Sequence, residues 1–190
     1  MGLAQIQAAQ ARLYTNAADR AAFYDKPQSF KIPWGLDDGD IDRLLAIPRS
    51  QIEAFAGSLI AKRRGEVAKM LPLTRKALGG HFADIFRQYA ERFTPAGIHR
   101  HRDDALAFAR SLHSRCGHAD IPLWVRDIAR YEAARIAAVH SRRPQLLLIH
   151  SDIRKFVFSS ETAYSDLPRS ITLLLIWPIK GSIRVLVGCI

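Results

Sequence analysis

The hydrophobic periodicity of the chain changes at Pro144. Before this residue, apolar side chains recur every three or four positions, which is typical of helices that pack one face on a core. After it, the runs QLLLIHS, RKFVFS, SITLLLIWPI and SIRVLVGCI are rich in β-branched and aromatic residues and are separated by turn residues, which indicates three or four strands. The chain is therefore predicted to be mainly α (α+β), with a helical bundle at residues 1–142 and a small antiparallel sheet at 143–190 packed on it.

The longest predicted helix is SQIEAFAGSLIAKRRGEVAKML, whose apolar face includes Leu59 and Val67. Arg63 falls on that same face, four residues after the first and four before the second. Another long helix is predicted at DIPLWVRDIARYEAARIAAVHSRR, with Pro122 in its first turn. Glu132 lies among apolar residues of this helix, so we expect its carboxylate to be buried and to need a partner.

Cysteine content and the lengths of the apolar runs argue against a disulfide-rich, secreted or membrane-spanning protein. The chain has 190 residues, which suits one domain with a small appendage, and a net charge of +10. Two cysteines, Cys116 and Cys189, do not suggest a disulfide framework and fit a reducing cytoplasm. The N-terminal residues lack the pattern of a secretory signal, and the longest apolar run is too short to span a bilayer. We therefore expect a cytoplasmic protein with no membrane partner.

Residues that could carry catalysis or bind a metal are scattered. His99 and His101 form HRH, and Cys116 and His118 form CGH, but neither has the second matched pair that zinc sites use. Asp103 and its neighbour are better interpreted as a helix start. The chain also lacks a nucleophile elbow, a P-loop and a dinucleotide-binding glycine motif. We expect no catalytic residues, no metal, no cofactor and no enzymatic activity of its own.

Residues 49–76 concentrate the positive charge, with seven cations and two anions. Three interpretations are open: a solvated helix face, a phosphate-contacting surface for nucleic acid, or a mixed role. In the mixed role, Arg63 or Arg64 turns inward to form a buried ion pair with Glu132, because the arginine fork suits a buried carboxylate. The cations expected to face a protein partner or nucleic acid are Lys62, Lys69, Arg75 and Lys76.

The order of motifs resembles a bacterial family named for a proposed DNA-binding domain, which includes the HvfC-like proteins. The resemblance rests on KRRGEVAKMLPLTRKALGGHFADIFRQYAERFTP, followed by DDALAFARSL and PLWVRDIARYEAA. It covers roughly residues 50–140, and its motifs are structural, so it speaks for the fold more than for an activity.

Members of that family are commonly partner subunits of TIM-barrel, multinuclear-iron oxidases that modify peptides, as in the methanobactin-type pairs. The resemblance implies a non-catalytic binding subunit that recruits or positions a peptide for such a metal-dependent enzyme. The iron and the chemistry would then belong to the barrel. The alternative is a DNA-binding transcriptional regulator, because the family name and the basic residues 49–76 both suggest one.

Overall fold

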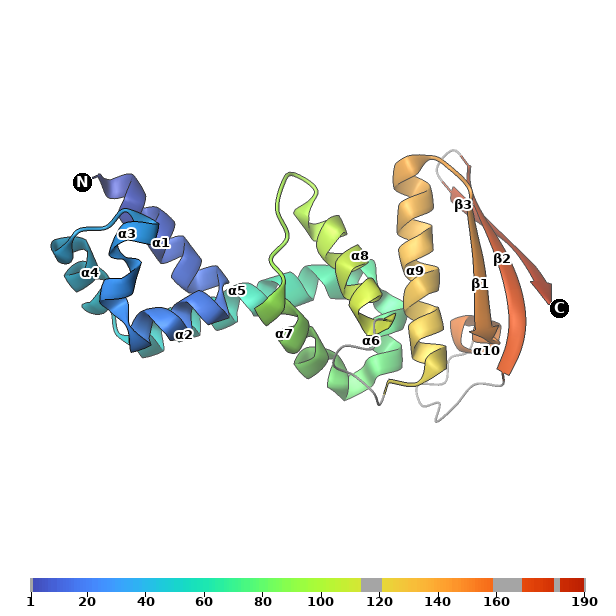
Figure 1. Cartoon of the computed structure of the whole chain (residues 1–190). Coiled ribbons are helices and arrows are strands. Elements are labelled where there is room, and N and C mark those ends of the chain that lie inside the picture. The colour runs from blue at the N-terminus through green and yellow to red at the C-terminus, as the bar shows by residue number, and fades with distance from the viewer. Residues whose placement is uncertain (1, 114–120, 159–168, 180–181, 190) are drawn as a thin grey trace. The chain divides into compact units, whose positions relative to one another are not determined.

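The computed structural model of the chain describes residues 2–113, 121–158, 169–179 and 182–189. It is mainly helical with a three-stranded antiparallel sheet near the C-terminus, as the periodicity predicts (Figure 1). The helices are α1 (Leu3–Thr15), α2 (Ala17–Asp25), α3 (Lys31–Trp34), α4 (Asp38–Leu45), α5 (Arg49–Met70), α6 (Pro72–Leu78), α7 (Phe82–Arg92), α8 (Arg100–His113), α9 (Leu123–Ser141) and α10 (Ile153–Phe158). Short 3₁₀ helices lie at Pro27–Phe30 and Gly79–His81, and the strands are β1 (Gln145–Ser151), β2 (Arg169–Ile179) and β3 (Ser182–Cys189).

The chain folds into two compact units. The boundaries between these units lie at positions other than residue 142, where the helical bundle is predicted to end. The first unit consists of Met1–Arg64 and Arg87–Thr94, and the second consists of Gly65–Phe86 and Pro95–Ile190. The sheet shares a unit with α6, α8 and α9, and the predicted division into residues 1–142 and 143–190 stays a prediction. The apolar inner side of the sheet accounts for the shared unit, because it needs a helix to cover it.

The first unit has its own hydrophobic core, built from α1, α2, α4 and the start of α5. Phe23 is fully buried there, and its ring stacks on Trp34 with 5.6 Å between the centroids. Helix α4 is capped by two aspartates, Asp37 and Asp40. Asp37 is the N-cap, and the two aspartates form a capping box in which each carboxylate accepts from the other's backbone N–H.

Helix α9 is the central element of the second unit, in contact with α6, α8, β1 and β2. Alongside it, an aromatic cluster fixes α7 to α8. The Phe108 ring meets Phe82 and Phe86 edge to face, with centroids 5.6 and 5.2 Å apart. All three rings are buried, so this cluster forms part of the core that supports α9.

The strands are ordered β1-β2-β3, and each neighbouring pair is antiparallel. Ile179 at the end of β2 pairs with Ser182 at the start of β3, and residues 180–181 between them lie outside the described part of the chain. The run RKFVFS, the candidate for a fourth strand, does not form one, because its residues 154–158 lie in α10. Asp152 accepts a hydrogen bond from the Arg154 backbone N–H, which stabilises a helix start, and Phe156 is buried against Trp124.

Among the residues that the structure describes, no helix is both long enough and apolar enough to cross a membrane.

Candidate binding surface and buried polar contacts

The outer face of the sheet, on the side away from α9, is apolar and exposed. Strand register places Leu146 beside Leu175, and Leu175 beside Leu186, across all three strands. Leu146 is 67% exposed and Leu186 is 64% exposed, which is unusual for large aliphatic side chains. We call the following residues the outer-face set: Leu146, Leu148, Ile171, Leu173, Leu175, Trp177, Ile179 and Leu186. A contiguous exposed apolar patch of this kind is typical of an interaction site.

Charge on the strands is of one sign. The described strand residues include no aspartate or glutamate, whereas β2 and β3 contribute Arg169 and Arg184, and β1 contributes His150. Arg184 is exposed and pairs in register with Trp177 of the outer-face set. The sheet therefore presents an apolar face with cations at its border, which complements an apolar surface bordered by carboxylates.

The inner face of the same sheet is packed on the helical part of the unit. Leu174 and Ile176 of β2 are 2% and 0% exposed. Asp127 of α9, which is 1% exposed, accepts a hydrogen bond of 2.8 Å from the His150 backbone N–H. The same carboxylate also lies 3.4 Å from the Arg130 guanidinium. This buried carboxylate ties β1 to α9, so the orientation of the sheet on the helix is fixed by a polar contact as well as by apolar packing.

Glu132 is buried as predicted, and its carboxylate has partners in α6. Its carboxylate accepts hydrogen bonds from the backbone N–H of Leu73 at 2.9 Å and of Thr74 at 2.7 Å, and from the Thr74 hydroxyl at 2.7 Å. These donors lie in the first turn of α6, where backbone N–H groups have no partner within the helix. Burial raises the pKa of the Glu132 carboxyl, and the hydrogen bonds from Thr74 and Leu73 oppose that rise.

Arg63 has partners in the first unit, whereas Glu132 belongs to the second, so the predicted pairing of Arg63 or Arg64 with Glu132 stays a prediction. The Arg63 guanidinium donates to the carbonyl oxygen of Phe93 at 2.8 Å and to that of Ala90 at 3.4 Å. These carbonyls lie at the end of α7, where the helix leaves acceptors unsatisfied and a cation is favoured by the helix dipole. The neighbouring Arg64 is only half-buried.

The four cations predicted to face a partner have different surroundings. Lys62 and Arg75 are exposed. Lys69 is exposed and pairs with Glu66 at 2.8 Å. Lys76 lies over the Phe156 ring, with its ammonium 4.8 Å from the ring centroid, and is half-buried. Lys62 belongs to the first compact unit and the other three to the second, so the prediction that they form one surface stays a prediction.

The histidines predicted to be unsuited to a metal site are only partly described. Cys116 and His118 fall within residues 114–120, outside the described part of the chain. His99 lies beside His140 of α9, with 5.5 Å between the ring centroids. Within the described ranges, no group of three or more His, Cys, Asp or Glu side chains could hold a metal ion.

Comparison with protein families finds one match: residues 47–114 match the family described as SCO6045-like, C-terminal domain. The match covers less than half of the chain, from just before α5 to the end of α8, and its description names no activity. No curated protein matches the chain. The resemblance to the HvfC-like family, and to the partner subunits of iron oxidases, therefore stays a prediction.

Proposed function

We propose that the protein is a non-catalytic binding subunit, and that the outer face of its C-terminal sheet docks a partner protein. The exposure of Leu146 and Leu186, on either side of Leu175 in the outer-face set, carries this proposal. When one face of an antiparallel sheet is in contact with solvent, apolar and polar side chains normally alternate along each strand. In this sheet both faces are apolar. Removing such a leucine from water on binding contributes roughly 1.5–3 kcal/mol.

The occupant proposed for this face is a protein surface that is apolar at its centre and acidic at its border. The described strands carry Arg169 and Arg184 but no carboxylate, so an acidic border would be attracted to them. The resemblance found in the sequence suggests a metal-dependent, TIM-barrel peptide-modifying enzyme as this partner. The subunit would then recruit or position the peptide on which that enzyme acts.

The test uses the full chain and a TIM-barrel, peptide-modifying iron enzyme from the same organism, with affinity measured by surface plasmon resonance. Leu186→Lys places a charge within the outer-face set, and we expect at least a tenfold loss of affinity, or about 1.4 kcal/mol. Ile98→Lys is the matched control, because Ile98 is 96% exposed in the same unit but lies in the loop before α8. Equal affinity for both variants and the wild type would contradict the proposal.

Two other outcomes would replace the partner enzyme with a different occupant. Concentration-dependent dimers in sedimentation, absent in Leu186→Lys, would mean that a second copy of the chain covers the face. A DNA footprint at one defined sequence that survives physiological salt would favour the DNA-binding alternative. We expect instead weak, sequence-independent DNA binding, because Lys69 and Lys76 already have partners within the chain.

A further inference from the structure

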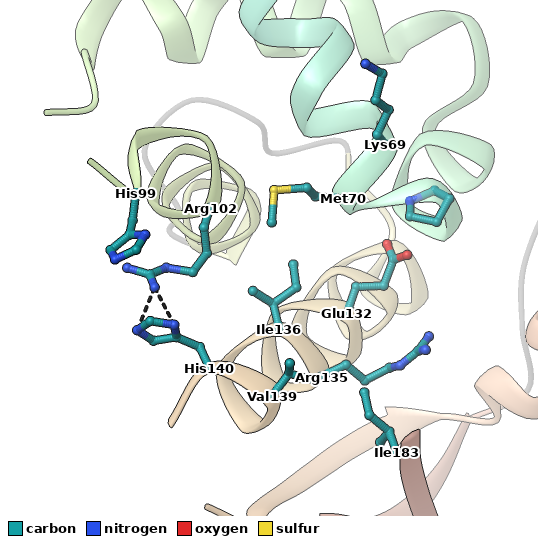
Figure 2. Close-up of a pocket in the computed structure, with 11 residues that line it drawn as sticks. Lys69, Met70, His99, Arg102, Glu132, Arg135, Ile136, Val139, His140 and Ile183 are labelled. Atoms are coloured by element: carbon teal, nitrogen blue, oxygen red, sulfur yellow. Dashed lines mark hydrogen bonds between the residues drawn. The ribbon is translucent and has the colours of Figure 1, made fainter. Parts of the chain in front are cut away.

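A cavity of about 550 Å³ lies in the second unit, between the end of α5, the start of α8, helix α9 and β3. Its volume is within the range of pockets that hold small molecules. Figure 2 shows its side chains in order: His99, Arg102 and His140 gather at one end, Met70 and Ile136 follow, and Glu132 and Arg135 lie at the other end. Nothing in this cavity belongs to the outer-face set.

The charged end of the cavity is basic. The Arg102 guanidinium contacts the ring nitrogens of His140, and the His99 ring lies edge-on to His140. Asp103 holds Arg102 in place through Nε and Nη2, with both nitrogens within 2.9 Å of one carboxylate oxygen. Arg102 is only 19% exposed, so its position is defined by packing as well as by this ion pair.

The lining leaves little negative charge free to compete for a ligand. Glu132 is the one carboxylate among the described lining residues, and its oxygens already accept three hydrogen bonds from the first turn of α6. Arg135 lines the cavity near Glu132, and its guanidinium lies over the Tyr131 ring without a carboxylate at bonding distance in the described structure. The balance of the lining favours an anion over a cation.

A metal ion fits this end poorly, although two imidazoles lie together there. A guanidinium in contact with one ring repels any cation that the two rings might share. An oxyanion has the opposite preference, because guanidinium and imidazole N–H groups both donate to carboxylate and phosphate oxygens.

The middle of the cavity is apolar, with Met70, Ile136 and Val139 following the basic end. A ligand that fills both parts therefore has a charged head and an apolar body. We propose that this cavity binds an organic oxyanion, a carboxylate or a phosphate monoester, whose head lies at Arg102, His99 and His140. Its apolar body would lie along Met70 and Ile136. This site is separate from the partner surface proposed above, and its existence does not depend on that surface.

The test is calorimetric titration of the full chain with simple probes. Octanoate and octyl phosphate carry the head and the body, octylammonium reverses the charge, and acetate lacks the body. We expect octanoate or octyl phosphate to bind at least tenfold more tightly than octylammonium and acetate. Which of the two binds more tightly identifies the head group. Equal binding of octanoate, octyl phosphate and octylammonium, or no binding of any, would overturn the proposal.

Variants locate the site. Arg102→Gln should weaken binding of the better oxyanion about tenfold or more, since a charge-assisted hydrogen bond is lost. Arg110→Gln, on the exposed side of the same helix, removes the same charge outside the lining and should leave the affinity within about twofold. A loss of equal size in both variants would mean that only net charge matters, and the site would be rejected.

A second pair of variants leaves the contacts of Arg102 unchanged, so that the proposal can still be tested if Arg102→Gln impairs folding. Val139 is 56% exposed at the edge of the cavity, so its replacement by a polar residue should be tolerated. Val139→Asp and Val139→Asn have nearly the same shape and differ by one charge. The aspartate variant should bind the oxyanion about fivefold or more weakly than the asparagine variant. Equal affinities would contradict the proposed position of the head group.

Discussion

The two faces of the C-terminal sheet carry similar side chains in different environments. On the inner face, Leu174 is 2% exposed beneath the helical layer, whereas on the outer face Leu186 is 64% exposed. Both are leucines on adjacent strands of one sheet. The inner face also has a polar tie, because Asp127 accepts from the His150 N–H. The inner face therefore stabilises the fold, and the outer face is left available for another protein.

This difference separates two reasons for placing an apolar residue on a strand. Burial in the chain's own core contributes to folding, and the cost of losing it appears in the free energy of unfolding. Exposure contributes little to folding, so an outer-face substitution should change binding and leave stability almost unaltered. The predictions below test that separation, beginning with the largest expected effect.

Leu174→Ala should lower the free energy of unfolding by about 2–5 kcal/mol, because it leaves a cavity beneath the sheet. Leu186→Ala should change the same quantity by less than about 0.5 kcal/mol, because that side chain is already in water. Urea denaturation followed by circular dichroism measures both. Similar losses in the two variants would mean that the outer face is covered within the chain.

Glu132→Gln tests the polar interior next to the sheet. The substitution should lower the free energy of unfolding by about 1–3 kcal/mol at pH 7. The carboxylate accepts from the Leu73 N–H with one oxygen and from the Thr74 N–H with the other, whereas an amide has only one oxygen. Glu53→Gln is the control, since Glu53 pairs with Arg49 on the surface and should lose less than about 0.5 kcal/mol. A cost for Glu132→Gln no larger than that control would show that the contact to α6 adds no stability.

The pH dependence of that cost has a defined sign. Burial raises the pKa of the Glu132 carboxyl above its ordinary value of 4.5. The stability that this shift provides is therefore complete below pH 4.5 and is lost as the pH rises through the raised pKa. Because glutamine does not titrate, the wild type should exceed Glu132→Gln in stability by more at pH 4 than at pH 7. Urea denaturation of both proteins between pH 4 and pH 7 measures this difference in the free energy of unfolding. A difference that grows as the pH rises would contradict the raised pKa of Glu132.

Lys76→Gln gives the smallest effect and tests the border between core and surface. Its ammonium lies over the Phe156 ring, so its loss should cost about 0.5–1 kcal/mol. Arg75→Gln, on the adjacent exposed residue, should change stability by less than about 0.5 kcal/mol. Thermal melts compare the two. Equally small changes in stability for the two variants would mean that the contact between Lys76 and Phe156 adds nothing to the fold. Lys76 would then behave like the exposed cations predicted to face a partner.

Local sequence pattern determined much of the secondary structure. The 3.6-residue period predicted α5 and α9, and the β-branched runs after Pro144 predicted β1, β2 and β3. The run RKFVFS was ambiguous, because six residues can satisfy either period. Burial of Phe156 against Trp124 resolved it as a helix. Such short segments take the form that lets their apolar side chain reach the core.

The candidate sites were less predictable because they depend on residues far apart in the sequence. The pattern around Glu132 predicted its burial, but its partner was decided by α6, a segment 58 residues away whose first-turn N–H groups needed acceptors. The cavity at Arg102 likewise needs His140 from another helix, 38 residues away. Neither pairing leaves a signal in local sequence.

The sequence by itself determined which strand residues are apolar, and the tertiary structure decided which of them are buried. The run LLLIW of β2 is apolar at every position. Because apolar and polar residues do not alternate in it, the sequence does not distinguish the inner face from the outer face. Packing of α9 on β1 and β2 covers Leu174 and Ile176 and leaves Trp177 half in solvent. The physical reason is that one helix layer can bury only one face of a sheet.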